Sequence, residues 1–252
     1  MHDKNDQKTF LCFNFITGSL NFQESVRCYL QFQTAFRASI SGIFRSLPGG
    51  TGIEGIIHVR SYSTMTVKEP ETAELCLYVP SLQELDYRAE FLADPLTMAY
   101  NRGYDLDFGG YDPQSGCLAF PAEEWQEWHE YWIGNEPERY YAYVMRKADH
   151  VFIGEVCLHH HGDDAFHEMG VVIEAGYRGR GYGKQALLLL LKHAFETMHV
   201  NAVHNTFETD RAGGAMALHL SCGFRLIGTH EGIAELLITQ DEWLKQSAHP
   251  AE

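Results

Sequence analysis

The sequence predicts an α/β fold in which a mixed, mainly antiparallel sheet is flanked by helices. From residue 74 onward, short segments with the alternating pattern of β-strands recur along the chain. Helical segments are inserted between them, which is typical of α/β domains. A glycine-rich stretch directly before a leucine-rich helix adds a candidate binding loop.

The individual elements can be assigned in order. A strand is predicted at 74–79, and Ser81 with Glu84 forms the capping-box pattern that opens a helix. A helix near 94–100 leads into a long loop rich in glycine and aspartate, residues 101–116. The remaining predictions are a helix at 121–133, strands at 140–146, 151–160 and 166–173, a long helix ending near 199, a strand at 202–208, a helix at 213–222 and a closing strand pair within 224–239.

Residues 1–64 are predicted to be a separate or weakly folded N-terminal extension, with the folded domain at 65–252. The extension has only a weak helical pattern, followed by a Pro48-Gly49-Gly50 break and a glycine-rich stretch. Met65 then begins a polar lead-in to the first strand.

Charge narrows the classes of partner. The chain of 252 residues carries a formal net charge of −15, with 19 basic and 34 acidic residues. Up to residue 64 there are 6 basic and 4 acidic residues, so the remaining 13 basic and 30 acidic residues give the body a charge of −17. Such a body repels nucleic acid and anionic membranes and attracts small cations. We therefore expect neither nucleic acid nor membrane as a partner.

Other compositional features predict a cytoplasmic protein. The first residues lack a basic segment followed by an apolar core, and no apolar run is long enough to span a membrane. The six cysteines are scattered without a C-x-x-C pair, which argues against a disulfide framework or a structural zinc site. No metal is expected.

Residues 178–184, which we call the glycine loop, form a compact candidate for anion binding. Gly179, Gly181 and Gly183 alternate with Arg180 and Tyr182, between Arg178 and Lys184. The first amides of a helix lack intrahelical partners and carry partial positive charge, so they attract phosphate groups. Glycine lets the main chain approach the oxygens closely.

The loop has three other possible interpretations. A P-loop fails because Arg178 stands where its first glycine belongs and Gln185 stands where its hydroxyl residue belongs. A dinucleotide fingerprint fits Gly181 to Ala186, with Glu208 ending the next strand, but seven residues separate Ile173 from Gly181 and only 42 residues follow Asp210. A merely structural glycine loop stays open.

The segment Arg178-Gly-Arg-Gly181-Tyr-Gly183, after a strand and before a long helix, resembles the acetyl-CoA signature [RQ]-x-x-G-x-[GA] of the GNAT acetyltransferase superfamily. Its flanks agree: HEMGVVIEAGY resembles the fourth strand of the family, and AMALHLSCGFRLIG resembles its last helix and the following Gly-Phe. The resemblance covers roughly residues 70–245 and implies a GNAT-like fold.

The resemblance also implies a cosubstrate and a mechanism. Acetyl-CoA would place its pyrophosphate on the loop amides and its pantetheine arm on the edge of the fourth strand, and an amine would attack the thioester directly. The implied coenzyme-binding residues are Val171, Val172, Ile173, Arg178, Gly179, Arg180, Gly181, Tyr182, Gly183 and Lys184.

Two residues are implied catalysts. Glu168 matches the position of a family glutamate that accepts the amine proton. The alternative role for Glu168 is that of a solvent-facing strand residue without a catalytic function. His219 stands four residues before Gly223-Phe224, where relatives often carry a tyrosine that acts as the acid. The alternative role for His219 is that of a polar residue on an exposed helix face. Ala212 replaces an asparagine that contacts the cofactor in many relatives, for which Asp210 or Asn205 could compensate.

Two further features have plain explanations. A histidine- and aspartate-rich segment could bind metal, but a solvated hairpin turn is favoured, because so many neighbours cannot converge on one ion. The tryptophan stripe at 125, 128 and 132 could line a substrate pocket, but packing of a helix on the sheet explains it more simply. The residues of the histidine- and aspartate-rich segment are His159, His160, His161, Asp163, Asp164 and His167.

The resemblance implies that the loop at 101–116, which we call the acceptor loop, helps to select the amine. This loop combines acidic and aromatic residues, which would suit a cationic amine with an apolar body. The favoured substrate is a small amine, a polyamine or an aminoglycoside-like molecule. A non-catalytic acyl-CoA-binding or sensor domain is the alternative, and a homodimer is left open. The loop residues concerned are Asp105, Asp107 and Asp112 among Tyr104, Phe108 and Tyr111.

Overall fold

The computed structural model describes residues 71–104, 109–160, 166–210 and 213–248. The predicted extension at 1–64 lies outside the described residues, so its separation from the domain stays a prediction. Within the described part, no helix is both long and apolar enough to cross a membrane.

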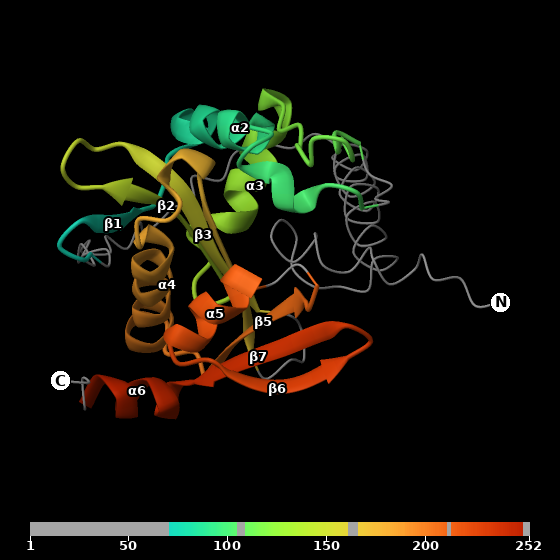
Figure 1. Ribbon diagram of the computed structural model, residues 1–252. Helices are drawn as coiled ribbons and strands as arrows, with labels where there is room; N and C mark the ends of the chain where they lie inside the picture. Colours follow the sequence, from blue (N-terminus) through green and yellow to red (C-terminus); the bar gives the residue numbers. More distant parts are fainter. Residues whose placement is uncertain (1–70, 105–108, 161–165, 211–212, 249–252) are drawn as a thin grey trace, which may run out of the picture. The chain divides into compact units, whose positions relative to one another are not determined.

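One seven-stranded sheet organises the domain, with the strand order β1-β2-β3-β4-β5-β7-β6 (Figure 1). All neighbouring strands are antiparallel except β4 and β5, which are parallel. The predicted mixed, mainly antiparallel sheet is therefore confirmed. The strands are β1 (Leu75–Tyr78), β2 (Arg139–Arg146), β3 (Phe152–His160), β4 (His167–Ile173), β5 (Ala202–Glu208), β6 (Arg225–His230) and β7 (Ile233–Thr239).

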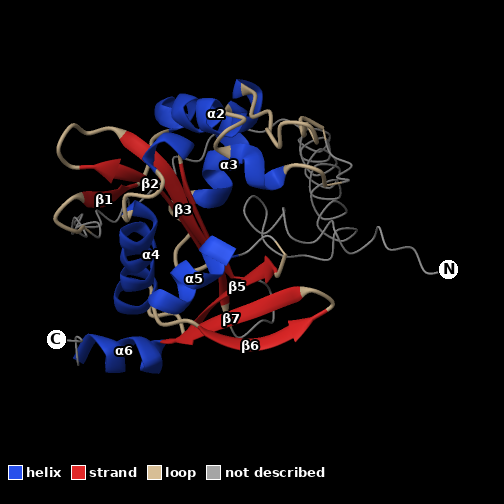
Figure 2. Cartoon of the chain, viewed as in Figure 1, coloured by secondary structure: helices blue, strands red, loops and turns tan. Residues whose placement is uncertain are grey.

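Helices cover both faces of the sheet (Figure 2). Side chains alternate along β2: Tyr140, Ala142 and Val144 pack in the cluster that includes α4, whereas Tyr141 and Tyr143 pack with α3. We call these the α4 face and the α3 face. The helices are α2 (Leu85–Ala93), α3 (Trp125–Trp132), α4 (Tyr182–Lys192), α5 (Gly213–Ser221) and α6 (Gln240–Ala248), with short turns η3 (Leu82–Glu84), η4 (Met98–Asn101), η5 (Ala122–Glu124), η6 (Ala175–Tyr177) and η7 (His193–Thr197).

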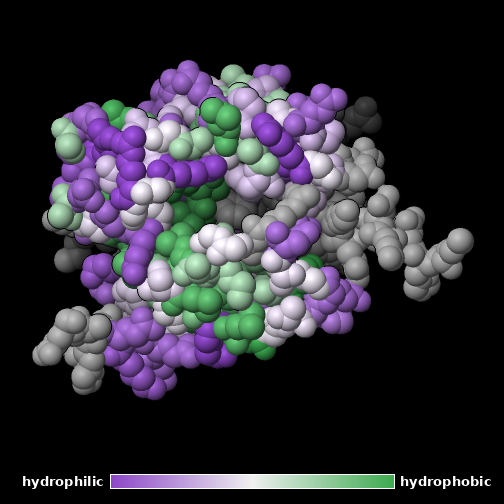
Figure 3. All heavy atoms as spheres, in the orientation of Figure 1, coloured by the Kyte–Doolittle hydropathy of each residue, from purple (hydrophilic) through white to green (hydrophobic). Residues whose placement is uncertain are grey.

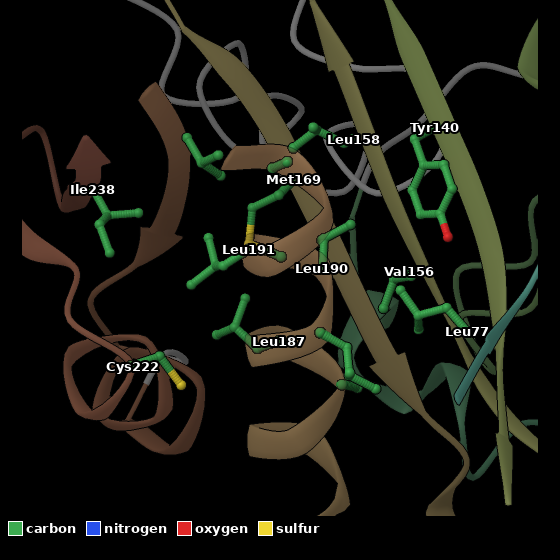
Figure 4. Packing of buried hydrophobic residues seen from close by; sticks show 14 of the residues in the cluster. Leu77, Tyr140, Val156, Leu158, Met169, Leu187, Leu190, Leu191, Cys222 and Ile238 are labelled. Carbon is green, nitrogen blue, oxygen red and sulfur yellow. The ribbon is translucent and has the colours of Figure 1, made fainter. Parts of the chain in front are cut away.

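The main core lies between α4 and the sheet. Leu187, Leu190 and Leu191 project from α4 among strand residues that include Val156 and Met169 (Figure 4). All five are almost completely buried, and each such side chain contributes roughly 1.5–3 kcal/mol through burial. The leucine run that follows the glycine loop therefore fixes the start of α4 against β4.

Most predicted elements are confirmed, but the helix predicted near 94–100 is only the short turn η4, one helix ends differently and one helix was not predicted. The capping box at the start of η3 forms, with the Ser81 amide donating to Glu84 Oε2 over 2.9 Å. The long helix stops being α-helical at Lys192 and continues as a π-helical turn to Thr197. Helix α6 was not predicted, although Thr239 and Glu242 form the same capping pattern: the Thr239 amide donates to Glu242 Oε2 over 2.8 Å.

Gly154 on β3 provides a test of how tightly β4 is packed. A Cβ atom at this position would lie 2.2 Å from the Val172 carbonyl oxygen. Gly154→Ala should therefore lower the free energy of unfolding by about 1–3 kcal/mol, because the strands must move apart. Gly214→Ala, where a Cβ meets nothing within 4 Å, should be neutral or slightly stabilising. Urea denaturation of both variants checks this, and equal stabilities would contradict the packing described.

Candidate active site

The strands β4 and β5 separate part-way along their length. Strand β3 pairs with all of β4 from His167 to Ile173, but β5 pairs with β4 only at His167 and Glu168. We call this point the fork. Beyond it, the edge of β4 that includes Val171, Val172 and Ile173 has no described strand on the β5 side. Among the described residues, the predicted coenzyme-binding edge is thus left without a neighbouring strand.

The glycine loop lies at the far end of β4 and leads into α4. Gly179 and Gly181 have φ angles of +76° and +80°, which favour glycine, and Gly181 is the residue that precedes the helix. A Cβ atom at either position would meet nothing within 4 Å, so the surface of the loop is open. Arg180 and Lys184 are exposed beside it.

Arg178 is used differently from the other cations of the loop. Its Nε donates to the Ile173 carbonyl over 2.8 Å, and its Nη2 donates to the Thr97 carbonyl over 2.7 Å. The guanidinium group therefore holds the loop against the end of β4 and against the segment after α2. The groups of the loop that this arrangement leaves for an anion are its main-chain amides and the exposed side chains of Arg180 and Lys184.

Two hollows lie near these elements. The space-filling view is hollowed between α2 and α5, with apolar surface at its floor (Figure 3). A second surface hollow of about 470 Å³ adjoins the first turn of α4. Its two cations are already paired, Arg146 with Asp149 and Lys147 with Glu71. The second hollow is lined by Ala73, Glu74, Arg146, Lys147, Ala148 and Tyr182.

Glu168 lies at the fork on the α3 face, between histidines of the two neighbouring strands. The strand register sets it beside His159 of β3 and His204 of β5. Its carboxylate oxygens lie 3.9 Å from His159 Nε2 and 3.4 Å from His204 Nδ1. All three side chains are buried, with Trp132 against His159 and Phe166 against His204. Glu168 is therefore not the solvent-facing strand residue that was its alternative.

The solvated turn predicted around residues 159–167 begins later than expected. Strand β3 continues to His160, so His159 is a buried sheet residue, and His160 pairs with His167 across the sheet. The other predicted residues, His161, Asp163 and Asp164, lie outside the described part. Within that part, no group of three or more histidine, cysteine or acidic side chains is arranged to hold a metal ion.

His219 lies on the other side of the fork, on the α4 face. Its Nδ1 is 2.8 Å from the Ala215 carbonyl and therefore carries the proton, so Nε2 accepts from Asn205 Nδ2 at 3.1 Å. Burial lowers the pKa of His219 to about 4 in spite of the bond to Ala215. The imidazole is neutral at pH 7, packed between Phe207 and Phe224. His219 is thus not on an exposed helix face.

The tryptophan helix α3 packs on the sheet, as favoured from the sequence. Trp128 and Trp132 both contact the ring of Tyr141, at centroid distances of 4.7 Å and 6.2 Å. Beneath them, the buried guanidinium of Arg88 pairs with Glu155 and lies 4.6 Å from the Trp128 ring. A buried ion pair of this kind is strongly destabilised when one partner is removed, so it fixes α2 on the sheet.

The acceptor loop is connected to the end of β5. Tyr104 is buried, and its hydroxyl donates to Glu208 Oε2 over 2.8 Å. The carboxylate of Asp112 accepts from the amides of Gln114 and Ser115, so it stabilises its own turn. Asp105, Asp107 and Phe108 lie outside the described residues, as does Ala212.

Sequence reasoning missed His204 and Thr97, and it grouped His159 with a turn instead of placing it beside Glu168. His159 and His204 flank Glu168, and Thr97 accepts from Arg178. Each of the two histidines lies in a correctly predicted strand, but their proximity follows from the strand register. The sequence contains no separate signal for Thr97.

Comparison with known proteins places the domain in a family. Residues 74–225 match the model of the acetyltransferase (GNAT) domain, which is more than half of the chain. No curated protein sequence is significantly similar to this chain.

Solved structures share the fold at low sequence identity. A GNAT-family acetyltransferase from Bacillus anthracis is 15% identical, with a TM-score of 0.52 over 69% of this chain and 99% of that one. The spermidine N-acetyltransferase of Vibrio cholerae, solved with CoA and spermine, is 16% identical, with a TM-score of 0.54 over 69% and 99%. FdhC, described as a nucleotide-linked sugar GNAT, is 16% identical, with a TM-score of 0.55 over 72% and 96%. With its fork, its glycine loop and the matching family model, the chain belongs to the GNAT family of acetyltransferases.

Proposed function

We propose that this protein is a cytoplasmic N-acetyltransferase that transfers the acetyl group of acetyl-CoA directly to a primary amine of a small cationic molecule. The observation that carries the proposal is the open edge of β4 beside the glycine loop. At Val171–Ile173, the main-chain groups that face away from β3 can pair with the amides of a pantetheine arm, apart from the Ile173 carbonyl, which accepts from Arg178. The amides of residues 179–184 can donate hydrogen bonds to the pyrophosphate oxygens at the start of α4.

The charge of the chain favours a cationic acceptor. A formal net charge of −15 attracts ammonium groups. The positive charge of the glycine loop is confined to that loop and does not change the sign of the whole chain. Glu208, which accepts from Tyr104, sets a carboxylate where the acceptor loop meets β5. Among the structural neighbours, the Vibrio cholerae enzyme is a spermidine N-acetyltransferase and FdhC is a nucleotide-linked sugar GNAT, so the fold is compatible with different acceptors. Polyamines are the first class to test.

Glu168 is the proposed base. The amine nitrogen attacks the thioester carbonyl, the carbon–sulfur bond breaks, and the nitrogen loses one proton while the sulfur gains one. The Glu168 carboxylate would accept the proton from nitrogen, directly or through water. His204 Nδ1 lies 3.4 Å from that carboxylate and can share the proton. Acetyl-CoA supplies the activated acyl group, and no covalent enzyme intermediate is needed.

The contacts of His219 do not favour its predicted role as the acid. Its Nδ1 proton is donated to the Ala215 carbonyl, and its Nε2 accepts from Asn205. A neutral imidazole in this tautomer has no proton to give to a leaving thiolate. We propose instead that His219 holds Asn205 beside Met169 at the fork. A coenzyme thiolate is a good leaving group without such an acid, because thiols ionise near pH 8.5.

A non-catalytic acyl-CoA sensor is the second candidate. The observation that favours it is the engaged, neutral His219 at the position where relatives often carry a tyrosine. A sensor would bind acetyl-CoA on the same loop and strand edge but would release no coenzyme A in the presence of amines.

The first prediction concerns turnover by the full chain. Given acetyl-CoA and pooled amines, wild-type protein should release coenzyme A thiol fastest with polyamines. Glu168→Gln should lower kcat roughly 100-fold or more, because it removes the base, while the affinity for acetyl-CoA stays within about threefold. Thiol release and calorimetric titration measure the two quantities.

Asp241→Asn is the matched control, since it removes an exposed carboxylate from the first turn of α6. It should leave kcat unchanged. Acetyl-CoA binding without turnover of any amine would favour the sensor, and full activity of Glu168→Gln would exclude Glu168 as the base.

The second prediction concerns the titration of His219. Its folded-state pKa of about 4 is below the ordinary value of 6.5, so the unfolded chain binds more protons between these pH values. The associated stability is present above pH 6.5 and is lost as pH falls toward 4. Between pH 7 and pH 5, wild-type protein should lose about 2 kcal/mol more unfolding free energy than His219→Gln. Urea denaturation at both pH values tests this, and equal losses would contradict a buried, neutral His219.

A further inference from the structure

Thr97 joins the segment after α2 to the segment that follows β4. It is completely buried. Its hydroxyl oxygen accepts from the Ala175 amide over 3.0 Å, and its carbonyl accepts from Arg178 Nη2 over 2.7 Å. Ala175 begins η6, the turn that leads into the glycine loop, so Thr97 holds both ends of that turn.

Asp94 fixes the orientation of Thr97. Its Oδ2 accepts from the Thr97 amide over 3.0 Å and also from the Thr97 hydroxyl. The Thr97 hydroxyl therefore donates its single proton to Asp94 and accepts from the Ala175 amide. These two bonds together fix the rotation of the hydroxyl group. The hydrogen bond from Thr97 is the main cause that lowers the pKa of Asp94, so the carboxylate is charged at neutral pH.

A second contact reinforces the same connection. The Tyr87 hydroxyl on α2 donates over 2.7 Å to Oε1 of Glu174, the residue directly after β4. On the other side, Thr97 is followed by η4, which enters the acceptor loop. Arg102 of that loop donates back to the Pro95 carbonyl over 3.1 Å. The turn from Asp94 to Thr97 thus contacts both the segment before the glycine loop and the start of the acceptor loop.

We propose that Thr97 is a positioning residue for coenzyme binding: its hydroxyl sets the place of the glycine loop relative to the acceptor loop. The inference rests on the proposed function, because it assumes that the glycine loop binds the coenzyme. Loss of the hydroxyl leaves the Ala175 amide and one Asp94 bond unsatisfied, and the turn must shift to find other partners. A shift of the loop amides moves the groups that receive the pyrophosphate.

The test is calorimetric titration of coenzyme A into the full chain, with thiol release from acetyl-CoA and a polyamine measured beside it. Thr97→Val keeps the shape of the side chain and removes the hydroxyl, and it should weaken coenzyme A binding about tenfold. Thr97→Ser keeps the hydroxyl and should bind within about threefold of wild type. Ile238→Val, a buried core change on β7, serves as the control for general loss of stability and should bind as wild type does.

The outcomes separate this inference from the proposed function. Weak coenzyme A binding by Thr97→Val, with wild-type binding by Thr97→Ser and Ile238→Val, supports the inference. If no amine is turned over in that case, only the catalytic proposal fails. Wild-type binding by Thr97→Val, or equal weakening in Thr97→Val and Ile238→Val, overturns the inference alone. A wild-type chain that binds no coenzyme A overturns both.

Discussion

The separation of β4 from β5 beyond Glu168 is the constraint on which the rest of the site depends. A parallel strand pair normally keeps its hydrogen bonds along its length, but here they end after two residues, although β3 pairs with all of β4. Arg178 already occupies the Ile173 carbonyl, so the other main-chain groups that face away from β3 beyond the fork are left for solvent or a ligand to satisfy. The same divergence leads the chain from β4 through η6 into the glycine loop, so the open edge and the loop occur together.

The fork also gathers polar side chains on both faces of the sheet. Because side chains alternate along a strand, Glu168 points to the α3 face and Met169 to the α4 face. On one face two histidines flank a carboxylate, and on the other Asn205 and His219 satisfy each other. Buried polar groups of this kind are stable only when their hydrogen bonds are made, which limits how each can act. Glu168 is therefore the stronger candidate for proton transfer, and His219 is fixed in its neutral form.

The strands and the glycine loop could be predicted from sequence because their signals are local. Alternation marks β1 over residues 75–78, and the Gly-Arg-Gly-Tyr-Gly stretch requires main-chain freedom at Gly179 and Gly181. The neighbours of Glu168 could not be predicted, since His159 and His204 meet it only through strand register, which depends on the whole sheet. The burial of His219 was equally hidden, because α5 is apolar around most of its circumference and shows no clear polar face.

The central claim is that coenzyme A binds along the open edge of β4 and on the glycine loop. Hydrogen–deuterium exchange of the full chain, with and without coenzyme A, tests it most directly, because amides that pair with a ligand exchange more slowly. The account predicts new protection confined mainly to residues 171–173 and 179–184, with little change in β6 and β7. Binding that protects other segments and leaves both of these unchanged would contradict it.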